Sequence, residues 1–491
     1  MEGSPRVAVI GAGIAGLVAG YALATRGFAV TVVEAGAFPG GRTTSWTDAA
    51  GHERDTAPHL VVDHYVNFLD VLGDLGLAGD LVWMRRPMYL RSDAPPAEWQ
   101  LHRGPAALHL LAPARNLSPR MLPRVAMAGL GTLTLPEERL RELDAIPYSE
   151  WQHGVVGDRL DDLADAASEA ACFLPAAEAS AYVVLSWLRT LMRTPTASHV
   201  ASWPAPFEEA FVGPLVAAIE QRGGRVRTAT AAVGVELEDE RVRALTLRPT
   251  SCEGPFLRAD GAVPLAPGSE PERLPCDFAI SAVPPQAFGP LLGEGVASAA
   301  GVEEAVGLPT TPALSVTLWL DRPVGPAPDC PPMCDSPAIR GFIDWASIDR
   351  RGADDPAVVQ LVLAEPRRQL EMDDEAIVAK TWAEYKALWP PAREAVVVDR
   401  AVERIDAAMV ACVPGSFARR PGAETKVDNL FLAGDWTTPH DPKPSMEAAT
   451  ISGRHAADGI LRAAGRAGLE VLDPPQSRVL GLGRRIRAKV A

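Results

Sequence analysis

The residues best suited to chemistry lie near the N-terminus, in a glycine-rich turn that is followed by an acid. Gly11, Gly13 and Gly16 form the pattern G-x-G-x-x-G, and Glu34 comes about 20 residues further on. The first glycine permits a tight turn, the second lets a pyrophosphate approach the backbone, and the third lets a helix pack closely on a strand. A carboxylate at the position of Glu34 can accept hydrogen bonds from a ribose. This spacing predicts a dinucleotide-binding site.

Two strands and a helix are expected around the glycine-rich turn, and they have to hold it where a ligand can reach its backbone. Residues 7–10 are an apolar run typical of a strand buried on both faces of a parallel sheet, a helix is expected from residue 14 to 25, and a second strand covers 29–33. In such a β-α-β unit the helix begins at Ile14 and Ala15, whose free N–H groups and positive dipole end favour phosphate. A glycine-rich turn in an ordinary α/β domain would explain the glycines but not the acid.

The same uncharged run, residues 7–25, also has the length of a signal peptide or membrane helix. Four glycines interrupt it, and a further apolar strand follows in place of a small-residue cleavage site. We therefore interpret this run as part of the β-α-β unit.

A second glycine motif distinguishes between dinucleotides. Gly40, Gly41 and Arg42 begin six residues after Glu34. Two adjacent glycines let backbone amides pass close to phosphates, and an arginine can neutralise them. The pattern E-x5-G-G-R resembles the extended FAD fingerprint of the flavin amine oxidase and carotene desaturase superfamily, so FAD is the expected cofactor. No Cys or His stands where a flavin tether would be expected, which favours non-covalent binding.

The far end of the chain supplies matching residues. An apolar strand over residues 429–433 is followed by Gly434 and Asp435, and Ser445 and Met446 open a helix that runs to about residue 461. Asp435 would bond the ribityl or pyrophosphate region, and the helix N-terminus would face the flavin O2 edge, where negative charge collects on reduction. Both ends of the chain would thus hold one cofactor.

The expected fold class is α/β with an α+β substrate domain: a discontinuous Rossmann-type FAD-binding domain, a mixed-sheet substrate domain and a helical, membrane-facing insertion. The expected boundaries are 1–83, 205–285 and 425–475 for the FAD-binding parts, 84–204 for the helical region, 286–424 for the substrate domain and 476–491 for a basic tail.

Composition narrows the function classes. The chain has 491 residues and a formal net charge of −15. An acidic protein lacks the basic face that phosphate neutralisation needs, so we expect no nucleic-acid partner. Six cysteines do not make a disulfide framework. Cys330 and Cys334 have no second Cys or His pair nearby to complete a zinc site, so no metal is predicted. We expect a cytoplasmic protein.

Nearly the whole chain resembles phytoene and ζ-carotene desaturases and the related bacterial hydroxysqualene dehydroxylases. The matching segments are T-A-P-H-L with Y-V-N at 56–67, L-S-V-T-L-W-L-D-R at 314–322 and G-D-W-T with S-M-E-A-A-T-I-S-G at 434–453. The resemblance implies that His59 and Leu60 lie along the flavin and that the backbone near Val233 contacts the adenine. His59 is the candidate acid–base residue, because its ordinary pKa is about 6.5. The alternative is a structural histidine beside the flavin. His440 is a second, weaker candidate.

Several residues differ from those usual in the family, and these differences indicate what kind of substrate is bound. Amine oxidases have a lysine where Ser315 stands and an aromatic residue where Ser445 stands, so an amine is not the expected substrate. Asp63 and His64 replace a Gly-aromatic or Gly-Ala pair, Pro58 replaces a leucine, and the loop 438–444 is unusually polar and rich in proline. These changes favour an oxygenated or smaller substrate.

Two segments reverse the overall charge. Residues 83–135 hold seven arginines against two acids among apolar side chains, and residues 476–491 hold four arginines and one lysine without an acid. Basic amphipathic segments bind anionic bilayers, so peripheral attachment to the cytoplasmic membrane is a hypothesis beside that of a solvated charged face.

The function we expect is FAD-dependent desaturation, or reductive dehydroxylation, of an apolar or amphipathic polyisoprenoid, with a quinone or O2 as electron acceptor. One alternative is a flavin oxidase or dehydrogenase that acts on a polar small molecule. Another is a non-enzymatic escort of prenylated proteins, although such escorts usually lose parts of the fingerprint that this chain keeps.

Overall fold

The computed structural model describes residues 3–84, 88–91, 94–98, 122–157, 161–194, 199–255, 262–324, 332–348, 357–438 and 442–474. Its centre is a five-stranded, fully parallel sheet in the order β10-β2-β1-β14-β20. These strands are β10 (Arg225–Arg227), β2 (Ala29–Val33), β1 (Arg6–Ile10), β14 (Phe278–Ser281) and β20 (Leu430–Leu432). The sheet draws on four distant stretches of the chain, which confirms the predicted discontinuous Rossmann-type fold.

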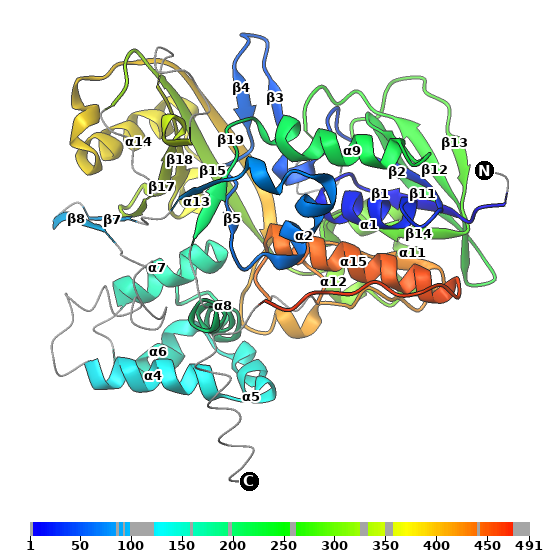
Figure 1. Ribbon diagram of the computed structural model, residues 1–491, viewed down its shortest axis with the longest axis horizontal. Coiled ribbons are helices and arrows are strands. Elements are labelled where there is room, and N and C mark those ends of the chain that lie inside the picture. Colours follow the sequence, from blue (N-terminus) through cyan, green and yellow to red (C-terminus); the bar gives the residue numbers. More distant parts are fainter. Residues whose placement is uncertain are drawn as a thin grey trace.

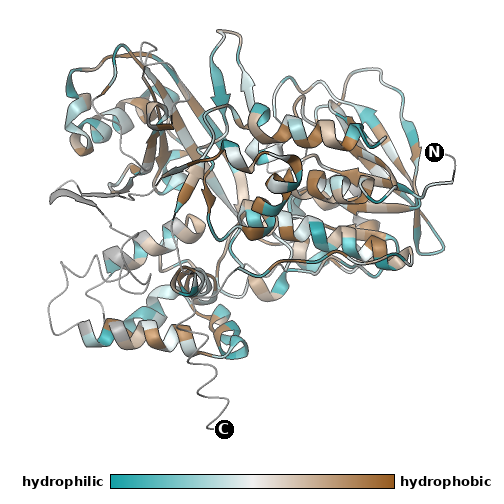
Figure 2. Cartoon of the chain, in the orientation of Figure 1, coloured by the Kyte–Doolittle hydropathy of each residue, from teal (hydrophilic) through white to brown (hydrophobic). Residues whose placement is uncertain are grey.

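Strand β1 is apolar because both faces of the sheet are covered. Val7 and Val9 pack on one side with α1 (Ile14–Ala24), α9 (Gly213–Glu220) and α15 (Met446–Ala463). Ala8 and Ile10 point to the other side, as alternation along a strand requires. Helix α1 lies between α9 and α15 in Figure 1, every residue of it is buried, and Figure 2 shows it as mainly hydrophobic. Burial on all sides explains the uncharged run that resembled a membrane helix.

The second face of the parallel sheet is covered by an antiparallel sheet and short helices. The antiparallel sheet has the order β11-β12-β13 and consists of β11 (Thr230–Glu238), β12 (Arg241–Pro249) and β13 (Glu272–Pro275). Helices α10 (Pro285–Leu292), α11 (Glu294–Ala300) and α12 (Glu303–Val306) complete the layer and share its apolar core.

A seven-stranded mixed sheet forms the second half of the molecule, in the order β19-β15-β18-β17-β16-β7-β8. Its long central pairs are antiparallel, and α14 (Asp374–Leu388) packs on it through the core around Tyr385. The strands are β15 (Thr310–Leu320), β16 (Met333–Asp335), β17 (Ile339–Asp344), β18 (Val358–Leu363) and β19 (Val397–Val410), with β7 (Met88–Arg91) and β8 (Ala94–Glu98).

The hairpin of β7 and β8 corrects one sequence expectation. Residues 84–204 were expected to be largely helical, but this hairpin adds two strands to the edge of the mixed sheet through the parallel pairing of β7 with β16. A separate three-stranded sheet joins β5 (Val61–Val62), β9 (Val200–Ser202) and β6 (Val82–Met84). Short strands of this kind carry too few residues to show a clear alternation, so only their partners identify them.

The remainder of that region is helical, as expected. It comprises α4 (Leu122–Thr134), α5 (Glu137–Glu142), α6 (Tyr148–Val156), α7 (Asp161–Cys172) and α8 (Ala181–Arg193), which gather below the mixed sheet in Figure 1. Their shared core includes Ala411, Cys412 and Phe417, which follow β19. Among the helices of the described part of the chain, none combines the length and apolar character that a membrane crossing requires.

Candidate functional site

The glycine-rich turn has the geometry that its sequence predicts. The Gly11 N–H donates to Val33 O over 2.8 Å, and Gly13 is the N-cap of α1. A Cβ on Gly16 would lie 2.0 Å from Gly11 O, so only glycine lets the helix approach the turn this closely. At Gly13 the result is the opposite: apart from Gly13 and its two chain neighbours, no atom of the described residues lies within 4 Å of the position that a Cβ would take. This open space beside a helix N-terminus fits a pyrophosphate.

Glu34 is buried at the carboxyl end of β2, and its carboxylate fastens the turn. Oε2 accepts a hydrogen bond from the Ala12 N–H, and Oε1 accepts one from the Gly36 N–H, each at 2.8 Å. Burial raises the pKa of Glu34, and these backbone donors counteract part of that rise. Each carboxylate oxygen has a second lone pair with which a ribose hydroxyl could be bound, as the sequence predicts.

The Gly40–Gly41–Arg42 loop lies directly against the turn. Gly40 N donates to Ala12 O over 2.8 Å, and Gly13 and Gly40 form an isolated parallel bridge. Two glycine motifs that are separated in sequence therefore line one backbone cradle. The space at Gly13 and the N–H groups in the first turn of α1 fit the diphosphate of a dinucleotide.

Arg42 connects the two ends of the chain. Its Nη2 donates to Asp435 Oδ1 over 2.7 Å, and its Nη1 donates to the backbone oxygen of Ala408. Asp435 is only 6% exposed, so the arginine compensates a nearly buried carboxylate. The guanidinium thus has a partner that the sequence motif did not reveal, and its contact with phosphate stays a prediction.

Helix α15 begins where the sequence predicts, and Ser445 is its N-cap. Ser445 Oγ accepts a hydrogen bond from the Ala448 N–H over 3.0 Å, and Met446 is buried in the core beside α1. Gly434 precedes this segment with a φ of +140°, and its N–H donates to Ser452 Oγ. The first turn of α15 therefore points toward the loops at the carboxyl ends of the parallel strands, where open α/β sheets bind ligands.

Glu447 is a site residue that sequence reasoning missed. Its carboxylate accepts hydrogen bonds from the backbone N–H groups of Asn67 and Phe68 and from the Asn67 side chain, at 2.7 to 3.0 Å. It thereby caps α2 (Val66–Leu75), whose own N-cap residue, Tyr65, makes no side-chain capping bond. The signal was present, since Glu447 and Asn67 both belong to segments on which the family resemblance rests.

Val233 occupies an irregular position in β11. Ala232 pairs with Leu247 and Gly234 with Thr246, so Val233 is skipped as a β-bulge. A bulge leaves backbone groups outside the ladder and often marks a functional edge. The expected backbone contact with adenine fits this geometry and remains a prediction.

His59 lies in a largely aromatic setting. Its ring is 5.3 Å from that of Phe207, its backbone oxygen accepts a bond from Ser202 Oγ, and it lines a small cavity with Trp203 and Trp345. Burial lowers the pKa of His59 to about 4, while nearby Asp55 and backbone oxygens act in the opposite direction. The ordinary value near 6.5 on which its candidacy rested is therefore wrong, and the imidazole is neutral at physiological pH.

Leu60, the neighbour of His59, packs on the apolar cluster around Trp319 and Trp345. Ser315, at the position of the amine oxidase lysine, is buried; its hydroxyl donates to Thr56 O over 3.1 Å and lies 3.5 Å from Gln360 Nε2. These partners are uncharged. His440 lies outside the described residues, as do residues 439–441 of the polar loop.

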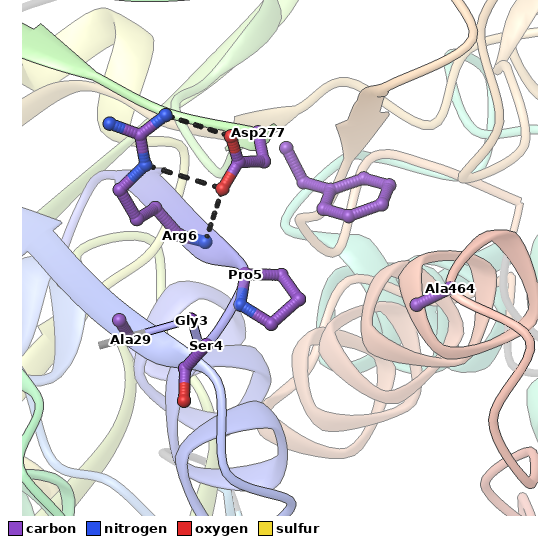
Figure 3. Close-up of a pocket in the computed structure, with 8 residues that line it drawn as sticks. Gly3, Ser4, Pro5, Arg6, Ala29, Asp277 and Ala464 are labelled. Atoms are coloured by element: carbon purple, nitrogen blue, oxygen red, sulfur yellow. Dashed lines mark hydrogen bonds and ion pairs between the residues drawn. The ribbon is translucent and has the colours of Figure 1, made fainter. Parts of the chain in front are cut away.

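A surface pocket of the described residues lies in another part of the molecule. Figure 3 shows it at the amino end of β1, beside the ion pair in which Arg6 Nη2 donates to Asp277 Oδ1 over 2.8 Å. Ligands of open α/β sheets bind at the carboxyl ends of the strands. The glycine turn lies at that opposite end of β1, so this pocket is not the cofactor site.

Comparison with known proteins agrees with this geometry. Residues 14–461 match the model of the family described as "Flavin containing amine oxidoreductase". The 15-cis-phytoene desaturase of Synechococcus elongatus is 25% identical, with 93% of this chain and 96% of that protein aligned. The zeta-carotene desaturase of Synechocystis sp. is 24% identical, and the alignment covers 93% and 97% of the two chains.

Solved structures show the same fold. An oxidoreductase from Methanosarcina mazei superposes with a TM-score of 0.69 at 15% identity, covering 91% of this chain and 98% of that one. A putrescine oxidase gives a TM-score of 0.67 at 16% identity, covering 94% and 99%. The predicted enzyme class, an FAD-dependent oxidoreductase, is confirmed by the family match. With its glycine turn, its second glycine loop and its C-terminal strand and helix assembled at one edge of the sheet, the chain belongs to the flavin containing amine oxidoreductase family.

Proposed function

We propose that this protein desaturates, or reductively dehydroxylates, an apolar polyisoprenoid, with FAD bound non-covalently. Similarity to carotene desaturases along 93% of the chain supports this proposal. The observation that carries it is the setting of Ser315, which is buried and bonded to the neutral Thr56 backbone and near Gln360. A site of this kind lacks the lysine expected at that position for amine chemistry and suits oxidation at carbon.

The chemistry divides between cofactor and protein. When bound, the flavin supplies a hydride acceptor or donor. The turn around Gly13, the buried Glu34 and the first turn of α15 hold it, and the aromatic side chains beside His59 exclude water from the reacting chain. His59 is the proposed proton acceptor, because its imidazole is neutral at any pH well above 4. For desaturation, a quinone or O2 is the proposed final electron acceptor. Dehydroxylation would instead take its hydride from flavin that an external electron donor has reduced.

Non-covalent binding has a simple test. Precipitation of the yellow protein with acid or heat should release all of its flavin into the supernatant, and the released compound should co-migrate with authentic FAD. Flavin that stays with the precipitate would contradict this part of the proposal.

The substrate class is tested by reduction of the bound flavin under anaerobic conditions. We expect phytoene or squalene, delivered in liposomes, to bleach the flavin absorbance and yield a product with an additional double bond. Putrescine, benzylamine and ordinary amino acids should leave the spectrum unchanged, because Ser315 and Ser445 replace the groups that orient an amine. Fast bleaching by an amine, with none by an isoprenoid, would instead support the alternative of a polar small-molecule substrate.

We further propose peripheral attachment to the cytoplasmic membrane, the source of such a substrate. Of the basic segment 83–135, the described helix α4 exposes Met127 by 65% and Leu130 by 54%, with Arg124 exposed beside them. Apolar side chains beside a cation suit an anionic interface, at about 1 kcal/mol for each basic residue. Arg85, Arg86, Arg120 and the tail 476–491 lie outside the described residues.

Flotation with liposomes tests this attachment. We expect the protein to float with anionic but not with neutral vesicles and to be released by high salt. Replacing both Met127 and Leu130 with serine should reduce flotation several-fold. The matched control replaces Val396 and Val398 with serine. Both are 58% exposed, one directly before β19 and one within it, and this variant should float like the wild type. Equal loss in both double variants would contradict α4 as the contact.

A further inference from the structure

Three ionisable side chains meet at the small sheet formed by β5, β9 and β6. Asp63 and His64 directly follow β5, and His199 directly precedes β9. The two strands pair antiparallel, with Val62 opposite Val200, and the Asp63 N–H donates to His199 O over 3.1 Å. The strand pairing therefore brings His199 next to Asp63 and His64, although the two segments are far apart in the sequence.

Three polar atoms of Asp63 and His64 lack hydrogen bonds in the described structure. Both Asp63 oxygens and His64 Nδ1 are buried and have no bonding partner among the described residues. The side chain of His64 is only 5% exposed and that of Asp63 12%. Asp63 Oδ1 lies 3.9 Å from His64 Nδ1, and Asp63 Oδ2 lies 4.0 Å from His199 Nδ1, both too far for hydrogen bonds. A buried carboxylate without donors is costly, so this arrangement calls for a further donor.

The 3.9 Å between Asp63 Oδ1 and His64 Nδ1 is a separation that a single oxygen atom can bridge. An oxygen about 2.8 Å from each of the two atoms would see them at an angle of about 90°, a geometry that a hydroxyl can adopt. Such a group can donate to Asp63 and accept from the Nδ1–H of His64, because a hydroxyl has one donor and two acceptor sites.

The charge around His64 also favours a neutral group. Burial, together with the positive charge of Lys443, lowers the pKa of His64 to about 3, so its imidazole is neutral. The same lysine disfavours a second cation. Lys443 lies two residues before Ser445, the N-cap of α15, and His64 is next to Tyr65, the N-cap of α2. The cluster therefore borders the end of α15 that is proposed to face the flavin.

We propose that Asp63, together with His64 and His199, forms a hydroxyl-binding subsite, and that the preferred substrate is an isoprenoid alcohol. This inference rests on the proposed function and specifies its substrate. Asp63 is the specificity-determining residue of the subsite, and the remainder of the substrate chain binds through apolar contacts.

Titration of the flavin-loaded protein with matched probes tests the subsite. The probes are geranylgeraniol and the same hydrocarbon without its hydroxyl group, and binding is followed by the change in flavin absorbance. We expect the wild type to bind the alcohol about ten-fold or more tightly than the hydrocarbon, as one hydrogen bond to a carboxylate implies. Asp63→Ala should abolish this preference and leave hydrocarbon binding unchanged, Asp63→Asn should retain part of it, and the exposed control Asp428→Ala should behave like the wild type.

Other results of the titration would contradict the proposal. Equal affinities in the wild type, or equal weakening of both probes by Asp63→Ala, would overturn the subsite while leaving the proposed function intact. Tighter binding of geranylgeranylamine than of the alcohol would overturn the choice of a hydroxyl. A flavin-loaded protein whose spectrum responds to none of the probes would count against the isoprenoid function as well as the subsite. The described residues offer no hydrogen-bond donor to the Asp63 side chain, so Asp63→Ala should not lower the thermal midpoint of unfolding. An unchanged midpoint would show that the variant is folded.

Discussion

Gly13→Val should produce a folded, colourless protein. Apart from Gly13 and its two chain neighbours, no atom of the described residues lies within 4 Å of the position that a Cβ on Gly13 would take, so a Cβ fits there without a clash. Its φ of −72° and ψ of 175° are also accessible to valine. The branched side chain would instead fill the volume that fits the pyrophosphate. We expect at least a hundred-fold loss of FAD affinity, measured from flavin absorbance per protein after gel filtration.

The matched control is Gly154→Val. Gly154 lies on the exposed side of α6, and a Cβ there would likewise have no described atom within 4 Å, so this variant should retain full flavin. Circular dichroism separates loss of cofactor from loss of fold. A Gly13→Val protein that remains fully yellow would place the cofactor away from this turn.

Glu447→Ala should cause the largest loss of stability among the site residues. It would leave two backbone N–H groups of α2 without their acceptor inside the protein, and the Asn67 side-chain amide would keep only the Leu472 backbone oxygen as an acceptor. Each unsatisfied buried donor costs about 1–3 kcal/mol, so a destabilisation of about 3 kcal/mol or more is expected. Urea denaturation of the flavin-free and flavin-loaded forms measures it.

Two further variants test the cause. Glu447→Gln keeps one oxygen acceptor and should lose only part of the stability. Glu424→Ala removes an exposed ion pair with Arg462 and should change the free energy of unfolding by less than about 1 kcal/mol. If Glu447→Ala unfolded at the same urea concentration as the wild type, Glu447 would not be the cap that holds α2 to α15.

Several elements were predictable because their signals are local. The strand 29–33 has the bounds that the sequence predicts, and α15 begins at Met446 as expected. Asp373 caps α14 through the Ala376 N–H, and Ser445 caps α15 through the Ala448 N–H. A cap depends on residues three apart, so neighbouring side chains alone define such a boundary.

The histidine candidates show a different limit. His59 was chosen for a pKa near 6.5, yet burial lowers it to about 4. Residue type reveals which groups can ionise, but the amount of water excluded around a group depends on which aromatic rings pack beside it. Phe207 belongs to a segment almost 150 residues away, and no local pattern announces this contact.

The amino-acid sequence alone is enough to identify the cofactor cradle and the family of this protein. The glycines at 11, 13 and 16 act through steric contacts within one turn, and Glu34 is one strand away, so spacing is sufficient to define them. Only the tertiary structure decided the contacts between distant segments: Arg42 with Asp435, Glu447 with Asn67, and Asp63 with His199. Such pairs form because packing of the apolar layers brings their strands and helices together, and the burial that results determines which polar groups are bonded and which remain open to a ligand.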